Sequence, residues 1–123
     1  MGLKVYVASK YENKARIQEI QYLLRQVGHT ISYDWTVNEQ VSRTQAILDL
    51  RGVADCDVFV GIFEQDVPYK GALVELGAAL ALGKPVYILG DAPVTRMLFF
   101  KHPHIRRGET AFMRDLLGVG GGI

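Results

Sequence analysis

The chain has 123 residues, of which 49% are hydrophobic and 22% are charged, and its formal net charge is +1 at pH 7. This composition predicts one soluble globular domain, and the balanced charge, without a stripe of basic and aromatic residues, argues against a nucleic-acid partner. No apolar run approaches the ~20 residues that span a bilayer, no signal peptide precedes the first strand-like segment, and the single cysteine excludes an internal disulfide. We therefore expect a cytoplasmic protein with no membrane partner, in which Cys56 is a small buried residue rather than a nucleophile.

The first third of the chain predicts a strand, a helix and a second strand. Residues 3–8 (LKVYVA) are mostly β-branched or aromatic and are followed by Ser9, which predicts a first strand. Asn13 is predicted to cap a helix whose apolar residues recur at spacings of three and four, and Gly28 is predicted to end it. A second strand is predicted over residues 30–35 (TISYDW).

The middle of the chain continues this alternation. Asn38 is predicted to cap a second helix that runs towards Val53. Residues 57–63 (DVFVGIF) form an almost unbroken apolar run, which is typical of a parallel strand covered on both faces. An apolar helix is predicted from Gly71, and it leads into a fourth strand over residues 85–89.

The last third predicts a short helix over residues 95–100, a fifth strand over 104–107 and a closing helix over 109–117. A Gly-rich tail, 118–123 (GVGGGI), is expected to be flexible, so that the domain proper covers residues 1–117. Alternation of this kind predicts an α/β fold: a single doubly wound, flavodoxin-like or Rossmann-like three-layer sandwich around a parallel sheet of about five strands.

Cofactor and metal motifs are missing from the sequence. The first strand is followed by S-K-Y-E-N rather than the glycine-rich dinucleotide fingerprint, and a Walker A loop is absent as well. His102 and His104 flank Pro103, but no Cys, Asp or Glu stands beside them at ligand spacing, which favours a polar loop over a metal site. We expect neither a cofactor nor a metal.

The predicted apolar helix carries a single carboxylate, Glu75, among leucines, alanines, valine and glycines. Glutamate is rarely buried without a partner, so this position needs an explanation. One interpretation is a solvent-facing acid that favours the positive end of the helix dipole in the first turn. The other is a functional group in the crevice that parallel strands form at their carboxyl ends, where small neighbouring residues leave room for a ring.

Two other residues are candidates to meet Glu75 at that edge. Asp49 lies near the predicted end of the second helix and can project over the same edge, although taken alone it is more typical of a solvated helix acid. Tyr6 lies in the first strand and faces opposite to Val5 and Val7, so its hydroxyl needs a hydrogen-bond partner if the ring is buried. A carboxylate on a neighbouring helix is a natural partner.

Three segments carry a family resemblance: VYVAS at residues 5–9, DLRGVADCDVFV at 49–60 and ELGAALALGKPV at 75–86. In this order they resemble the nucleoside 2-deoxyribosyltransferase family, including its relatives that hydrolyse deoxynucleoside 5′-monophosphates. The resemblance spans most of the chain. It implies cleavage or transfer of an N-glycosidic bond with retention of configuration.

The resemblance also implies catalytic roles for three residues. Glu75 matches the nucleophile and would form a covalent glycosyl ester, Asp49 matches the acid that protonates or orients the leaving base, and Tyr6 matches the tyrosine that positions the nucleophile. Attack requires an ionised Glu75, and the helix dipole and the Tyr6 hydroxyl are both expected to favour that form.

The sequence departs from the family in the loop before Glu75. Transferases of the family often carry another acid shortly before the nucleophile, but here Tyr69 and Lys70 occupy the nearer positions and Asp66 lies farther away. The serines that hold a 5′-phosphate in the hydrolase relatives are not evident, and Lys10 or Lys70 is either a phosphate-binding point charge or a solvated lysine. The residues predicted to contact the substrate are Ser9, Trp35, Asp66, Lys70 and Gly71.

Several alternatives stay open at this point. The substrate is a nucleoside or a 5′-monophosphate, and the reaction is transfer or hydrolysis. Other readings are cleavage of another N-glycoside, such as the nicotinamide bond of NAD, and a nucleotide-binding or sensing module without turnover. By resemblance, we expect a homo-oligomer, a dimer or higher, because family members generally complete the crevice with residues of a neighbour.

Overall fold

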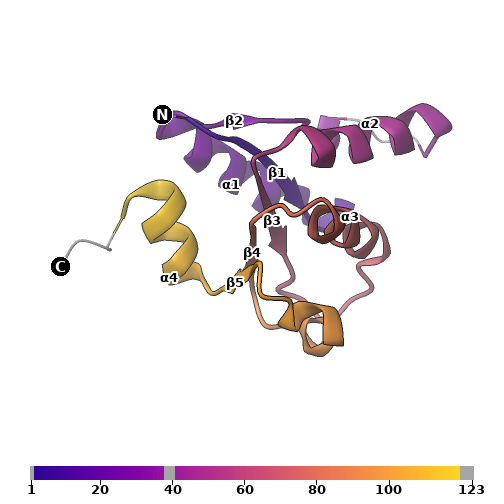
Figure 1. Cartoon of the computed structure of the whole chain (residues 1–123). Coiled ribbons are helices and arrows are strands. Elements are labelled where there is room, and N and C mark those ends of the chain that lie inside the picture. The colour runs from indigo at the N-terminus through magenta and orange to yellow at the C-terminus, as the bar shows by residue number, and fades with distance from the viewer. Residues whose placement is uncertain (1, 38–40, 120–123) are drawn as a thin grey trace.

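Five parallel strands form one sheet in the computed structural model, which describes residues 2–37 and 41–119 (Figure 1). The strands are β1 (Lys4–Ala8), β2 (Thr30–Ile31), β3 (Val58–Ile62), β4 (Val86–Leu89) and β5 (Ile105–Arg107). They lie in the order β2-β1-β3-β4-β5, and every neighbouring pair is parallel. This is the flavodoxin-like order, in which the direction of winding reverses between β1 and β3 and ligands bind outside the carboxyl ends of the strands at that point.

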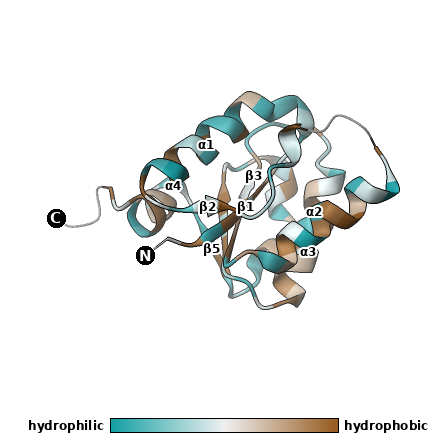
Figure 2. Cartoon of the chain, turned by 90° about the horizontal axis from the view of Figure 1, so that it is seen from above, coloured by the Kyte–Doolittle hydropathy of each residue, from teal (hydrophilic) through white to brown (hydrophobic). Residues whose placement is uncertain are grey.

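Helices cover both faces of the sheet and give the molecule three layers (Figure 2). One face carries α1 and α4, whereas α2 and α3 pack side by side on the other. The helices are α1 (Lys14–Gln26), α2 (Arg43–Asp55), α3 (Lys70–Ala81) and α4 (Glu109–Phe112). The predicted doubly wound α/β sandwich is therefore confirmed.

The sheet divides the apolar interior into two cores. Val5 and Val7 of β1 pack with α1 and the C-terminal helix, whereas Tyr6 and Ala8 face α2 and α3, because successive side chains of a strand point to opposite faces. The Tyr6 ring stacks on Phe59 of β3 with 5.9 Å between ring centroids. The face towards α2 and α3 thus holds a completely buried tyrosine whose hydroxyl must find a partner.

The second strand is much shorter than the predicted segment 30–35. It comprises Thr30 and Ile31, and a 3-10 turn follows at Trp35–Val37. Ser32 N–H still donates to Val5 O, but the next ladder acceptor, Val7 O, is taken by the Trp35 indole Nε1–H at 2.7 Å. The tryptophan side chain therefore ends the pairing of this edge strand.

The predicted helix caps also need correction. Asn13 immediately precedes α1, but its side chain makes no capping bond and instead donates to Ser9 Oγ at 3.3 Å. The other predicted cap, Asn38, lies outside the described residues, and α2 begins later than predicted, at Arg43. There Ser42 is the cap, and its hydroxyl oxygen accepts the backbone N–H of Gln45.

The C-terminal third follows the prediction in outline. Two 3-10 turns, Pro93–Arg96 and Leu98–Lys101, replace the predicted short helix, and α4 continues as a single π-helical turn at Met113–Leu117. Gly118 ends this turn with φ of +69°, a conformation that favours glycine, and residues 120–123 of the predicted tail lie outside the described residues. None of the described helices has the length and hydropathy needed to cross a membrane.

Candidate active site

A cavity of about 520 Å³ opens beside the carboxyl end of β1, between that strand and the helices α2 and α3. Its size is within the range of small-molecule sites. It combines carboxylates, lysines and aromatic rings on one surface. The lining residues are Ser9, Lys10, Tyr11, Trp35, Val41, Asp49, Pro68, Tyr69, Lys70, Gly71, Ala72 and Glu75.

Glu75 lines this cavity and is bonded to Tyr6, which is completely buried and does not line it. The Tyr6 hydroxyl donates to Glu75 Oε2 at 2.6 Å, and only 8% of the Glu75 surface is exposed. Glu75 is therefore not the solvent-facing acid of the alternative interpretation. It lies in the second turn of α3, which begins at Lys70, so the predicted first-turn stabilisation by the helix dipole is wrong.

The protonation of Glu75 also differs from the prediction. Burial raises its pKa to about 7, because desolvation disfavours the carboxylate; the Tyr6 hydrogen bond lowers it and the nearby Asp49 raises it. The predicted effect of Tyr6 therefore has the right direction but is outweighed. Burial and the two carboxylates raise the pKa of Tyr6 far above its ordinary value, so this phenol remains a donor.

Asp49 lies in the middle of α2 rather than near its end. It is half-buried and lines the same cavity as Glu75. Gln45 Nε2 donates to Asp49 Oδ1 at 2.7 Å. Burial raises the pKa of Asp49, and the Gln45 hydrogen bond opposes that rise. The site thus holds two carboxylates in different surroundings, one held by a phenol and the other by an amide.

An aromatic wall forms one side of the cavity. Trp35 and Tyr11 are both partly buried, with 6.4 Å between ring centroids and 49° between their planes. The indole N–H already donates to the β1 backbone, which fixes the orientation of the ring. The indole can therefore contact a ligand only through its ring surface. Tyr11 was not among the predicted substrate contacts, although it lies in the segment that follows the first strand.

The loop between β3 and α3 supplies the opposite wall. Of the predicted substrate contacts in this region, Lys70 and Gly71 line the cavity, whereas Asp66 is exposed and is not among the lining residues. Tyr69 takes a wall position, with its ring edge-on to Phe63 and its hydroxyl accepting the Gln65 backbone N–H at 3.0 Å. Its large ring in a loop otherwise rich in polar residues was the sequence signal for this contact.

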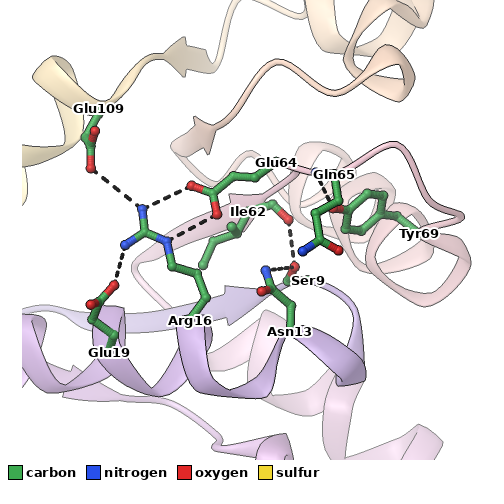
Figure 3. Close-up of polar contacts among 9 residues, drawn as sticks. All are labelled: Ser9, Asn13, Arg16, Glu19, Ile62, Glu64, Gln65, Tyr69 and Glu109. Atoms are coloured by element: carbon green, nitrogen blue, oxygen red, sulfur yellow. Dashed lines mark hydrogen bonds and ion pairs between the residues drawn. The ribbon is translucent and has the colours of Figure 1, made fainter.

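Polar contacts anchor this loop on the side away from α3 (Figure 3). Arg16 of α1 donates two hydrogen bonds to the Glu64 carboxylate, one of 3.2 Å from Nε and one of 3.0 Å from Nη2. The same guanidinium contacts Glu19 on its own helix and Glu109 of α4. One arginine therefore joins both helices of this face to the residue that opens the β3–α3 loop.

Ser9, another predicted substrate contact, lines the cavity, but its hydroxyl already makes hydrogen bonds within the protein. Ser9 Oγ donates to Ile62 O at 2.7 Å and accepts from Asn13 Nδ2 (Figure 3). These bonds tie the end of β1 to the end of β3 at the point where the winding reverses. A substrate that used this hydroxyl would have to share it with the Ile62 carbonyl.

The described residues contain no group of three His, Cys, Asp or Glu side chains placed to hold a metal. His102 and His104 lie ring edge to ring face, with 4.8 Å between centroids, and His102 Nδ1 accepts the His104 backbone N–H. Cys56 is buried, and burial raises the pKa of its thiol to about 11. It therefore stays a thiol at neutral pH, unsuited to nucleophilic attack.

The family model of nucleoside 2-deoxyribosyltransferases matches residues 5–103, which include every residue that lines the cavity. A search of curated protein sequences finds no match. The 2-deoxyribosyltransferase of Bacillus psychrosaccharolyticus has a similar structure, with a TM-score of 0.61 and 26% identity over 73% of this chain and 74% of that one.

Two further solved structures are similar. The CMP N-glycosidase BcmB of Clostridium botulinum has a TM-score of 0.63 and 25% identity over 85% of this chain and 87% of that one. A conserved protein of Enterococcus faecalis V583 has a TM-score of 0.59 and 18% identity over 96% of this chain and 87% of that one, a level at which the likeness concerns the fold.

Proposed function

Because the chain belongs to the nucleoside 2-deoxyribosyltransferase family, we propose that it cleaves or transfers the N-glycosidic bond of 2′-deoxyribonucleosides or their 5′-monophosphates. The similar structures include a 2-deoxyribosyltransferase and a CMP N-glycosidase, two enzymes that break the same class of bond. The observation that carries the proposal is the Tyr6–Glu75 pair, a buried carboxylate held by a phenol in the wall of a cavity of suitable size.

The proposed first step is nucleophilic attack by Glu75. A carboxylate oxygen bonds to C1′ of the sugar while the C1′–N bond to the base breaks, and the bonding electron pair leaves with the base nitrogen. Tyr6 donates to Oε2 and leaves Oε1 to attack. The product is a glycosyl ester on Glu75. A free base or a water molecule then attacks C1′, and the ester C–O bond breaks to restore the carboxylate.

Asp49 is proposed to act on the leaving base. Its half-buried carboxyl faces the same cavity, and burial raises its pKa, which increases the protonated fraction available to neutralise the departing nitrogen. In its ionised form Asp49 orients the base by accepting a hydrogen bond. Both roles need the carboxyl group beside the base rather than beside the sugar.

The remaining wall residues are proposed to bind the substrate. Trp35 and Tyr11 offer aromatic surface to the base, and Gly71, where a Cβ would meet no atom within 4 Å, leaves open space at the start of α3. Lys10 and Lys70 place positive charge at the cavity and favour an anionic group such as a 5′-phosphate. Their contribution is measurable as the ratio of activity on a monophosphate to that on its nucleoside.

The test is an assay of base release and base exchange. Deoxynucleosides, their 5′-monophosphates, CMP and NAD are incubated with the protein, with and without a free acceptor base, and the products are separated by chromatography. We expect release from deoxyribosyl substrates, and exchange in addition if the enzyme is a transferase. Cleavage of NAD alone would replace this proposal, and binding without any cleavage would favour a sensing module.

The nucleophile has a separate test. Intact-protein mass spectrometry after quenching is expected to show a glycosyl adduct that peptide mapping assigns to Glu75. Glu75→Ala should lose both the adduct and the activity, whereas Glu12→Ala, which removes an exposed carboxylate, should retain both. Full cleavage by Glu75→Ala would show that the nucleophile is another group.

We also propose a homo-oligomer and a cytoplasmic location. The first is supported by apolar side chains on the outer surface of α3 and the following turns, among them Val74, Leu98 and Phe99, which are 64%, 74% and 63% exposed. The second rests on the free, buried Cys56, which suits a reducing compartment.

A further inference from the structure

Gln45 occupies a position in α2 that connects Asp49 to the rest of the site. Its Nε2 lies 2.7 Å from Asp49 Oδ1 and 3.2 Å from the hydroxyl oxygen of Tyr33. Its backbone N–H is held by the hydroxyl of Ser42, which caps the helix at this turn. Both the backbone and the side chain of Gln45 are therefore fixed.

The chemistry of the amide determines which end faces Asp49. The Nε2 group carries two hydrogens, and the two contacts use them both, one for the carboxylate and one for the phenol. With the amide reversed, its carbonyl oxygen would face the carboxylate oxygen and repel it. The observed arrangement presents a donor to Asp49 Oδ1 and leaves Oδ2 for another partner.

Tyr33 links this pair to the other half of the site. A Cβ placed on Gly52 of α2 would lie 2.6 Å from the Tyr33 Cβ and 2.9 Å from the Tyr6 ring, so both tyrosines pack against the same glycine. Tyr6 holds Glu75 directly, whereas Tyr33 holds Asp49 through Gln45. The two carboxylates are thus each supported by a tyrosine next to Gly52.

We propose that Gln45 is a positioning residue for the N-glycosidic reaction, which orients the Asp49 carboxyl so that Oδ2 meets the leaving base. This inference rests on the proposed function. It assigns a role to a residue that does not line the cavity and that acts on the substrate through Asp49 alone. The hydrogen bond to a charged acceptor makes this effect larger than that of an ordinary helix contact.

The charged and titratable groups around Asp49 determine how the loss of Gln45 would change the pKa of Asp49. Glu75 on α3 is a second carboxylate, and the charge of Asp49 disfavours its ionisation. Tyr6 and Tyr33 are phenols on the sheet side, and Lys10 and Lys70 are the cations that line the same cavity. Removal of the Gln45 donor leaves burial to act on Asp49 without this opposition, so its pKa should rise further.

A purely structural role is the competing explanation, because glutamine and aspartate four residues apart stabilise a helix by about 0.2–0.5 kcal/mol wherever they occur. The test therefore compares Gln45→Leu in the natural chain with Gln45→Leu in an Asp49→Asn background. Each protein is assayed for kcat and KM against pH with the preferred substrate, and the Asp49 carboxyl is titrated by ¹³C NMR. Gln18→Leu is the matched control, since Gln18 bonds Thr36 and does not line the cavity.

We expect Gln45→Leu to move the NMR titration of Asp49 to higher pH, to move one limb of the pH–rate profile with it, and to lower kcat/KM about tenfold, the effect of losing a hydrogen bond to a charged group. In the Asp49→Asn background the same change should alter kcat/KM less than about twofold. An unmoved Asp49 titration, or an equal loss in both backgrounds, overturns the inference while the proposed function stands. A protein that cleaves none of the substrates refutes both.

Discussion

Tyr6 and Glu75 are joined by one hydrogen bond, and its loss should be visible in the pH dependence of the reaction. In the proposed mechanism Glu75 attacks as a carboxylate, so kcat/KM should fall as the pH drops through about 7, the pKa that burial gives this group. Tyr6→Phe keeps the ring that stacks on Phe59 but removes the hydrogen-bond donor. The acid limb of the pH–rate profile should therefore move to higher pH, and at pH values below that limb kcat/KM should fall about tenfold.

The measurement is a pH–rate profile of each protein with one substrate. Tyr22→Phe is the control, because Tyr22 is 60% exposed on α1 and lies away from the cavity. A Tyr6→Phe profile with the midpoint of the natural enzyme would mean that the hydroxyl does not stabilise the reactive carboxylate.

Glu75 should also reduce the stability of the fold at neutral and alkaline pH. Its pKa rises from 4.5 in the unfolded chain to about 7 in the folded one, so the unfolded chain ionises first and stability falls between these values. Glu75→Gln never ionises and keeps an acceptor for Tyr6. It should be more stable than the natural protein at pH 8, by up to about 3 kcal/mol, and little different at pH 5.

Denaturant unfolding at the two pH values measures this difference. Glu12→Gln replaces an exposed carboxylate on the same molecule and should show no such dependence on pH. If the stability of Glu75→Gln relative to the natural protein is the same at pH 8 as at pH 5, ionisation of the buried Glu75 carboxyl does not destabilise the fold as its surroundings imply.

At the scale of single residues, the sequence indicated which side chains meet but not how deeply they are buried. A glutamate amid apolar helix residues indicated Glu75, and a strand tyrosine opposite Val5 and Val7 indicated its partner. The depth at which Glu75 is buried could not be read from the same pattern, because it depends on how α3 packs against the sheet and α2. Desolvation is the largest influence on its pKa, and it reverses the direction expected from the Tyr6 hydrogen bond and the helix dipole.

Among the elements, α2 owes its close approach to the sheet to Gly52. A methyl group there would lie 2.6 Å from Tyr33 Cβ and 2.9 Å from the Tyr6 ring, and a fully buried ring cannot move aside freely. Gly52→Ala should therefore push α2 outwards, destabilise the fold by about 1–3 kcal/mol and displace Tyr6 and Asp49 together. Unfolding in denaturant measures the loss of stability, and kcat/KM reports the displacement of Tyr6 and Asp49.

Gly77 provides the matched control for this substitution. It lies in α3, where a Cβ would meet no atom within 4 Å, so Gly77→Ala should gain stability from helix propensity, about 0.5–1 kcal/mol. A loss of stability in Gly52→Ala together with a gain in Gly77→Ala would support close packing at Gly52. Equal gains from both would contradict it.

Element types were easier to predict than element ends. The apolar runs of β3 and β4 and the periodicity of α1 identify strands and a helix from local pattern. The early end of β2 could not be seen in the same way, because it depends on the Trp35 indole replacing a backbone donor at Val7 O. The cap of α2 was misplaced for a related reason, since Asn38 and Ser42 are both good capping residues and sequence alone does not choose between them.

On the scale of the whole molecule, the order of the strands decides where chemistry can occur. Alternation of strands and helices predicted a parallel doubly wound sheet, and such sheets bind ligands at their carboxyl edge. In agreement with that rule, Ser9, Trp35, Lys70 and Gly71 line one cavity, although they come from three separate segments: the end of β1, the turn after β2 and the start of α3. The rule did not separate them from Asp66, which lies in the loop before α3 but is exposed and does not line the cavity, because the rule places a loop without fixing the direction of each of its side chains.

The outer surface of α3 gives the last prediction. A second hollow of about 520 Å³ lies between α3 and the turn Leu98–Lys101, and its lining is apolar apart from His102. Exposed apolar surface of this kind favours association, and the proposed homo-oligomer gives it a second copy of the chain as its partner. Phe99→Asp should place a charge in that interface and weaken the assembly at least about thirtyfold, the effect of losing a central aromatic contact.

Light scattering coupled to size-exclusion chromatography, over a range of protein concentrations, measures the change. Tyr22→Asp is the control, because Tyr22 is 60% exposed, close to the 63% of Phe99, but lies on α1 across the sheet. We expect Phe99→Asp to dissociate into folded monomers and Tyr22→Asp to remain assembled. A natural protein that is monomeric at assay concentrations would refute the oligomer, and an assembled Phe99→Asp would place its interface on another face.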